Sequence, residues 1–402
     1  MLDSVIVVVF VGAFLLLISN RVRNNQNWSA TVTPLASIIG SGFLVSVPLL
    51  ASAVGIWAVV AVAMLTVLAY LIGGAIRYNI RFGEPIFEAA NGGHKIKSVE
   101  TISHLVLIGA YFISVSYYLV LLAAFGMKLL GQTDPMIGKC VSSAIVGSIA
   151  LIGAIKGLDG VQRAEKFTVS ANLASIAALI AALLIFGVEL PAEYSWEAAA
   201  KQHEQINGHT FRFVMGLLII VQGFETSRFM GSLYDAPTRI AAMRRSQIVS
   251  TIVYLIFFAL MIPLYPYFTS TTDVAGFITV IGRVTSWLPF VVTAGAVASQ
   301  FSAAVADSIG ASGLIAETTD KRVNTNHAYI VIGVVGLIVI WSTDVVSVVA
   351  LASRAFALFY ALQCAVATLI ANHRGEKKRA TGYGVLSAVS ALVAILGIPA
   401  SG

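Results

Sequence analysis

Long apolar runs are the feature that most constrains what this chain can fold into. A helix needs about 20 predominantly apolar residues to cross the hydrocarbon core of a bilayer. Hydrophobic residues make up 58% of the 402 positions and charged residues only 11%, more apolar surface than a soluble domain could bury. We therefore expect an all-α polytopic membrane protein. Twelve spans are predicted, at approximately 3–20, 31–54, 56–78, 100–127, 136–157, 164–188, 209–234, 243–268, 286–315, 327–342, 345–371 and 381–400.

The first apolar run is expected to remain in the protein as a helix. No basic region precedes it, and the polar stretch SNRVRNNQNW that follows offers no small-residue cleavage site. A secretory signal peptide would carry both features. The later segment YDAPTRIAAMRRSQ is interpreted as a short amphipathic helix on the inner face, opened by Asp235 and Pro237.

The distribution of lysine and arginine predicts the orientation in the membrane. With the N-terminus outside, the inner loops collect 18 of the 25 basic residues and the outer loops five, while Arg228 and Arg354 fall within spans. Inner loops of membrane proteins are enriched in lysine and arginine. We expect a multi-pass protein of the plasma membrane, the inner membrane of a bacterium, with both termini on the extracytoplasmic side.

The sequence lacks motifs for catalysis, resident metals and nucleotides. Cys140 and Cys364 lie far apart, the six histidines form no HxxH or HExxH pair, and no GxxxxGK[ST] loop occurs. The formal charge of +6 does not indicate nucleic acid, because the basic residues gather in the inner loops. We expect a non-enzyme without an organic cofactor, whose partners are the lipid bilayer, a small-molecule substrate and a monovalent cation.

Glycines interrupt two of the predicted spans near mid-membrane. The stretch ASIIGSGFLVSVP contains Gly40, Ser41 and Gly42 in the second span, and VQGFETSRFMG contains Gly223 and Phe224 in the seventh. Glycine-interrupted helices at corresponding positions of two halves are typical of inverted-repeat transporters, whose unwound backbone binds substrate and ions. We expect both stretches to be unwound and these five residues to bind substrate. The alternative is a contact of small residues between packed helices.

Ionisable side chains inside the predicted spans are further candidates. A charge at the centre of a membrane helix costs about 2.5–3.5 kcal/mol on insertion scales, so each such residue suggests a functional role. Glu225 could bind the amine of a substrate and Arg354 its carboxylate, while Glu225, Asp307 or Arg228 could take part in proton coupling. Alternatively, Glu225 and Arg228 pair with each other, because residues three apart share a helix face. Tyr117, in the stretch GAYFISVSYYLVLL, could line a substrate cavity or simply pack.

Three local patterns resemble the amino acid–polyamine–organocation (APC) superfamily, and most closely its solute:sodium symporters. The first is A-S-x-x-G-S-G-F-L-x-x-x-P, following an extra N-terminal helix; the others are SRFMGSLYDAPTRIAAMRRSQ and SQFSAAVADSIGASGLIAETTDK. The resemblance implies a LeuT-type fold of two inverted five-helix repeats with one extra helix at each end. The implied boundaries are 1–28 for the N-terminal helix, 29–188 and 189–371 for the repeats, and 372–402 for the C-terminal helix.

The resemblance also implies a sodium site. Its ligands would include the backbone carbonyls of Ala36 and Ile39 and the hydroxyl of Ser302. Ala303 stands where the family has a second hydroxyl, so the implied site is partly degraded. Asp307, five residues after Ser302, could compensate for this loss or carry a proton. Sodium and proton coupling both remain open on these residues.

The sequence thus predicts a cation-coupled symporter of a small polar organic solute that works by alternating access. An amino acid or related zwitterion is expected, from the resemblance and from Glu225 and Arg354 as opposite-charge handles. The alternative is a membrane sensor or regulatory protein that has kept the transporter fold without transport, which the missing hydroxyl at Ala303 mildly favours.

Overall fold

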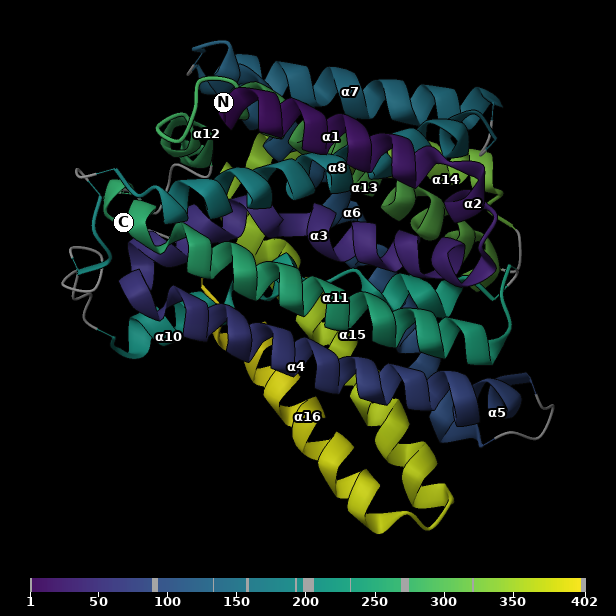
Figure 1. The fold of residues 1–402 in the computed structure, drawn as a ribbon. Coiled ribbons are helices and arrows are strands. Elements are labelled where there is room, and N and C mark those ends of the chain that lie inside the picture. Colours follow the sequence, from purple (N-terminus) through teal and green to yellow (C-terminus); the bar gives the residue numbers. More distant parts are fainter. Residues whose placement is uncertain are drawn as a thin grey trace.

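A computed structural model describes residues 2–88, 93–132, 134–156, 159–191, 194–197, 206–231, 233–268, 275–319 and 322–398 as a bundle of helices (Figure 1). The α-helices are α1 (Leu2–Ile18), α2 (Asn20–Arg23), α3 (Gln26–Val54), α4 (Ala58–Tyr78), α5 (Glu84–Glu88), α6 (His94–Leu129), α7 (Pro135–Lys156), α8 (Asp159–Val188), α10 (Gly208–Met215), α11 (Ala236–Met261), α12 (Gly276–Ile281), α13 (Leu288–Thr318), α14 (Thr325–Ser342), α15 (Val345–His373) and α16 (Lys377–Leu396). Short turns of tighter or wider helix are η1 (Gly55–Trp57), η2 (Asn79–Gly83), η3 (Leu218–Val221), η4 (Phe224–Phe229) and η5 (Ile262–Tyr267).

Within these described ranges, eight helical segments are long and apolar enough to cross a membrane. Two shorter apolar helices, 2–18 and 326–342, accompany them. An all-helical, multi-span membrane protein is therefore confirmed, and the count of twelve spans stays a prediction. Both chain ends lie at the same end of the bundle, while α16 and the end of α15 project from one side (Figure 1).

The centre of the bundle is built from α3, α6, α8, α13 and α15. Helix α13 packs against α6 and α8, α15 against α6 and α16, and α11 against α3 and α4. Helix α14 packs on α7, where a Cβ atom added to Gly333 would lie 2.6 Å from the Ala150 Cβ. Small residues let membrane helices approach closely, since lipid supplies no hydrophobic force between them.

The prediction of a short amphipathic helix at 234–247 is wrong. The segment that begins at Ala236 is not a separate amphipathic helix; it is the first part of α11, which continues unbroken to Met261. The predicted start is correct, because the Asp235 side chain accepts a hydrogen bond of 3.0 Å from the Thr238 N–H, as an N-cap does. Hydrogen bonds from the Thr238 hydroxyl and from its backbone N–H lower the pKa of Asp235 from its ordinary value.

Candidate functional site

The helix predicted over 209–234 is interrupted as its glycine indicated. It is divided into α10, η3 and η4, with Gln222 extended and Gly223 at a φ of +115°. That backbone conformation favours glycine. A Cβ on Gly223 would also lie 2.5 Å from Ser37 Oγ and 2.7 Å from the Ile38 backbone nitrogen in α3. Gly223 therefore permits both the break and its close contact with α3.

The corresponding break predicted in α3 is wrong, because α3 is helical without interruption from Gln26 to Val54. A Cβ on Gly40 would lie 2.7 Å from Ser299 Oγ in α13, and one on Gly42 would lie 2.8 Å from the Ile220 Cα in η3. These two glycines therefore serve close packing, the alternative that the sequence left open. Glycine costs a helix only about 1 kcal/mol, less than leaving backbone groups unpaired in an apolar environment. The side chain of Ser41 lies outside the described residues.

A small cavity lies where α3, α8, η4 and α13 meet. Its volume is about 20 Å³, room for about one water-sized ligand. It brings together Ala36, Ser302 and Ala303, three of the positions named for the sodium site, while Ile39, which is buried in the core, is not part of the lining. The full lining is Thr33, Ala36, Ser37, Val169, Asn172, Thr226, Ser299, Ser302, Ala303 and Ala306.

The cavity lining includes residues that sequence reasoning had not assigned to this site. Thr33, Ser37, Thr226 and Ser299 add hydroxyl groups to that of Ser302. A signal was present in α13, because residues 299 and 302 are three apart and so share a helix face. No such signal links Thr226 to α13, because the two are brought together only by the break at Gly223.

Glu225 follows this break and is fully buried. Its Oε2 accepts hydrogen bonds from the Gly223 N–H at 2.9 Å and from the Tyr360 hydroxyl at 2.8 Å. Among the residues that the structure describes, its Oε1 has no hydrogen-bond partner. The neighbouring Phe224 ring stacks on Tyr360, with centroids 5.1 Å apart. The break therefore presents one carboxylate oxygen that is ready to accept a further donor.

Asp307 is buried in α13, with an exposed fraction of 2%, and its Oδ2 accepts a hydrogen bond from Ser114 in α6. Its carboxylate lies close enough to Glu225 for the two groups to interact electrostatically. Tyr117 is buried beside Tyr118, with centroids 5.1 Å apart, and Tyr118 accepts a 2.5 Å hydrogen bond from Gln222. The structure thus gathers the predicted Glu225, Asp307 and Tyr117 around the interrupted helix.

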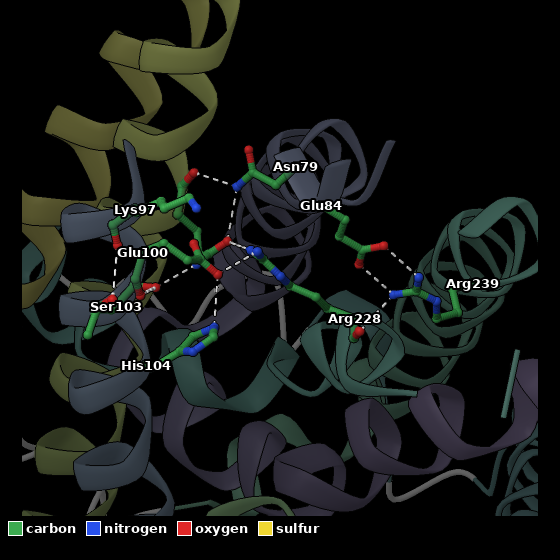
Figure 2. Close-up of polar contacts among 10 residues, drawn as sticks. Asn79, Glu84, Lys97, Glu100, Ser103, His104, Arg228 and Arg239 are labelled. Atoms are coloured by element: carbon green, nitrogen blue, oxygen red, sulfur yellow. Dashed lines mark hydrogen bonds and ion pairs between the residues drawn. The ribbon is translucent and has the colours of Figure 1, made fainter. Parts of the chain in front are cut away.

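Arg228 belongs to a separate polar network (Figure 2). Its guanidinium pairs with Glu100 of α6 at 2.5 Å and donates to Gln363 of α15. Glu100 also contacts His104 at 2.8 Å. The predicted alternative of a Glu225–Arg228 pair is therefore not what forms; the two side chains bind different partners.

A second ion pair lies next to this network (Figure 2). Arg239 of α11 donates two hydrogen bonds of 2.7 Å to the carboxylate of Glu84 and one of 2.8 Å to the Arg228 carbonyl. The two arginines thus join α5, α6, α11 and α15 at the end of the interrupted helix.

The pairing of Glu225 with Arg354 as two substrate handles is wrong. Arg354 is exposed, and its Nε donates a 2.8 Å hydrogen bond to the Ala394 carbonyl of α16. It therefore contacts the C-terminal helix, whereas Glu225 contacts Tyr360. Arg354 and Tyr360 are six residues apart on α15 and therefore lie on different faces of that helix, as helical periodicity requires.

Helix α15 contacts the interrupted helix at three levels. Ser353 Oγ accepts a 2.9 Å hydrogen bond from the Ile219 N–H, Tyr360 binds Glu225, and Gln363 binds Arg228. Polar side chains from one helix therefore bind η3 before the break and η4 after it.

Comparison with solved structures identifies the type of fold. The chain is similar to the structure of MhsT in complex with L-phenylalanine, with a TM-score of 0.58 and 14% identity over 92% of this chain and 97% of that one. It is also similar to a substrate-bound, outward-open Na⁺-coupled sialic acid symporter, with a TM-score of 0.51 and 14% identity over 100% and 98% of the two chains. The fold is therefore LeuT-like.

The family follows from sequence comparison. A family model described as an APC superfamily transporter matches residues 20–397, so the chain belongs to the APC superfamily of transporters. It is also 34% identical over 400 residues to an uncharacterized protein of Aquifex aeolicus (strain VF5), covering 98% of this chain and 97% of that protein. The predictions of superfamily, of a LeuT-type fold and of a transporter rather than an enzyme are confirmed.

Proposed function

We propose that this transporter is a sodium-coupled symporter of a small, amine-bearing polar solute. The observation that supports sodium most is the cavity between α3, α8, η4 and α13. Six of its ten lining side chains carry oxygen, from five hydroxyls and the Asn172 amide, and none is ionisable. Neutral oxygen donors around a space for one small ligand suit a hard monovalent cation, since divalent cations usually require carboxylates as well.

The donor set also compensates for Ala303. Asn172, Thr226 and Ser299 line the same cavity as Ser302, so the hydroxyl missing at position 303 leaves several other oxygens. The cation would contact both η4 and α13, and thus the interrupted helix and its neighbour. A cation that binds one arrangement of these elements better than another shifts the protein toward that arrangement. This is how sodium would be coupled to alternating access.

Amino acids and related zwitterions are the first solutes to consider. Glu225 offers an acceptor for an amine, next to Gly223 and Phe224, while Gly42 brings α3 close to η3. The protein is expected in the plasma membrane, with both termini extracytoplasmic. Its two five-helix repeats are expected at 29–188 and 189–371. The basic inner loops support this orientation.

Proton coupling is the second candidate. It is favoured by one observation, the buried Glu225 carboxylate with an unpartnered Oε1 close to the second buried carboxylate of Asp307. Two neighbouring carboxylates in an apolar site do not readily ionise together, so a proton could be bound and released there.

Thermal unfolding of the purified protein in detergent tests the sodium proposal. A ligand at 100 times its Kd stabilises the folded state by about 2.7 kcal/mol, so NaCl should raise Tm above that in equal KCl. Ser302→Ala and Asn172→Ala should shift the sodium titration to at least tenfold higher concentration. Ser308→Ala is the control, since Ser308 is on the same helix, does not line the cavity, and donates its hydroxyl to the Ala304 carbonyl. Equal Tm values in sodium and potassium would contradict sodium binding and favour the proton.

A further inference from the structure

Two arginines meet on the surface where α4 and α11 lie side by side (Figure 1). Arg77 is in the last turn of α4, and Arg244 lies near the start of α11. The two guanidinium groups are close enough for their positive charges to interact. Arg244 is exposed and Arg77 half-buried. This surface therefore carries two adjacent positive charges.

Neutral groups hold Arg77 in place. Its guanidinium donates a 2.5 Å hydrogen bond to Gln247 Oε1 and a 3.3 Å hydrogen bond to the Tyr70 carbonyl, and it lies 4.8 Å from the centre of the Tyr70 ring. Gln247 in turn donates a 2.7 Å hydrogen bond to the Ala69 carbonyl, which fixes α11 to α4 beside Arg77. These acceptors use two of the five guanidinium N–H groups. They orient Arg77 but supply no negative charge.

Neither arginine forms an ion pair among the residues that the structure describes. The arginines that do form one within the same ranges are Arg228, Arg239, Arg374 and Arg379. Two like charges held side by side repel each other. An anion that accepts hydrogen bonds from both removes this repulsion, and the planar guanidinium fits the oxygens of a phosphate group particularly well. Arg77 and Arg244 together therefore favour a phosphate.

Exposed apolar side chains continue from the two arginines toward the middle of the bundle. They are Val67 and Leu71 on α4 and Ile248 and Ile252 on α11, and each is between 43% and 57% exposed. With a rise of about 1.5 Å per residue, these positions lie about 6–15 Å along the helices from the arginines. One leaflet contributes about half of a 30 Å hydrocarbon core, so its acyl chains extend over the same depth. The surface therefore fits a molecule that joins a phosphate to apolar chains.

We propose that this surface binds one anionic phospholipid, with its phosphate held by Arg77 and Arg244 and its acyl chains lying along α4 and α11. Tyr70 and Tyr383, which both interact with Arg77, lie at the level of the headgroup, where tyrosines are enriched in membrane proteins. Basic sites between transmembrane helices bind lipid headgroups by the same chemistry. A zwitterionic phospholipid fits less well, because its ammonium group returns positive charge to a surface that already has an excess of it. The bound lipid would join α4 to α11 whichever solute the protein carries.

A lipid titration tests the proposal. The purified protein in detergent is titrated with phosphatidylglycerol and with phosphatidylcholine of the same acyl chains, and bound lipid is counted by native mass spectrometry. We expect the first phosphatidylglycerol to bind with a Kd at least fivefold lower than that of phosphatidylcholine. Glycerol 3-phosphate, which has the phosphate but no acyl chains, should not displace it at an equal concentration. Equal affinities for the two lipids would overturn the proposal, and displacement by glycerol 3-phosphate would indicate a site for soluble anions instead.

Variants then assign the site. Arg244→Gln should weaken phosphatidylglycerol binding at least fivefold and leave phosphatidylcholine binding unchanged. Arg77→Gln should have the same effect on the lipids, and it should also lower Tm because the hydrogen bond to Gln247 is lost. Arg244→Gln keeps the test valid if Arg77→Gln does not fold, because the exposed Arg244 side chain forms no hydrogen bond within the described ranges.

The matched control is Arg245→Gln. It removes an equal charge from the same turn of α11, but the Arg245 side chain donates a 3.2 Å hydrogen bond to Asn27 in α3 and so points away from Arg77. We expect Arg245→Gln to bind phosphatidylglycerol as the wild type does. An equal loss in Arg244→Gln and Arg245→Gln would show that only net charge matters, and wild-type binding in Arg244→Gln would show that the lipid binds elsewhere. Either result would overturn the proposal.

Discussion

Arg228 of η4 and Glu100 of α6 form a buried ion pair with an N–O distance of 2.5 Å. Gln363 of α15 binds both partners, donating to Glu100 Oε2 at 3.1 Å and accepting from Arg228. Three elements that are far apart in the sequence are therefore joined at one end of the interrupted helix (Figure 2).

Glu100→Gln should destabilise the protein markedly. The substitution leaves the Arg228 charge buried without its partner, a change that typically costs about 3–5 kcal/mol. We expect Tm in detergent to fall by several degrees and the double variant Glu100→Gln/Arg228→Gln to recover part of this loss. Glu376→Gln, which breaks exposed ion pairs with Arg374 and Arg379, should leave Tm nearly unchanged. If Glu100→Gln and Glu376→Gln lower Tm equally, the buried ion pair contributes no more to stability than the exposed ones.

Gly42→Ala should separate α3 from η3. The new Cβ would lie 2.8 Å from the Ile220 Cα, which is backbone and cannot rotate away. Overpacking of this kind costs about 1–3 kcal/mol. Gly109→Ala in α6, where no atom lies within 4 Å, is the matched control. We expect Tm to fall only for Gly42→Ala; equal Tm values would show that the contact is looser than described.

Gly223→Ala should impair folding and transport together. Gly223 and Gly375 both have positive φ angles, of +115° and +75°, but only Gly223 has neighbours within 4 Å. Alanine in a left-handed conformation costs about 1–2 kcal/mol at either position. We expect Gly223→Ala to lower Tm, and uptake into proteoliposomes, more than Gly375→Ala does. The difference measures the cost of disturbing the contact with α3. No additional loss would mean that the break tolerates a side chain.

Arg354→Gln should leave ligand affinity unchanged. The Arg354 side chain hydrogen-bonds to the Ala394 carbonyl in α16, so its loss affects the contact between α15 and α16 and not the site at Glu225. We expect the midpoint of a thermal-shift titration with a stabilising solute to match wild type even if Tm decreases slightly. A tenfold weaker midpoint would restore Arg354 as a substrate-binding residue.

The sequence was most informative where one physical rule dominates. Apolar length determined the helices, and a glycine within an otherwise apolar span identified the break at Gly223. The same rule failed at Gly40 and Gly42, because glycine permits either an unwound backbone or close packing. Only the position of Ile220 and Ser299, supplied by other helices, distinguishes the two cases.

The charged residues show the same limit. That Glu225, Arg228 and Asp307 would be buried followed from their place in apolar spans. Their partners Glu100, Ser114 and Tyr360 could not be predicted, because they lie 128 or more positions away in the chain. They are also on helices whose mutual packing the sequence does not encode locally. Arg354 was misplaced since hydropathy gives depth in the membrane but not the direction in which a helix face points.

The three hydrogen bonds from α15 to the interrupted helix have a mechanical consequence. Ser353 binds ahead of the break, while Tyr360 and Gln363 bind after it. A chain interruption by itself would act as a hinge that lets two half-helices swing independently. Here α15, a continuous helix, is hydrogen-bonded to the interrupted helix on both sides of the break. We therefore expect the two halves to move together with α15 as one rigid body, relative to α3 and α13.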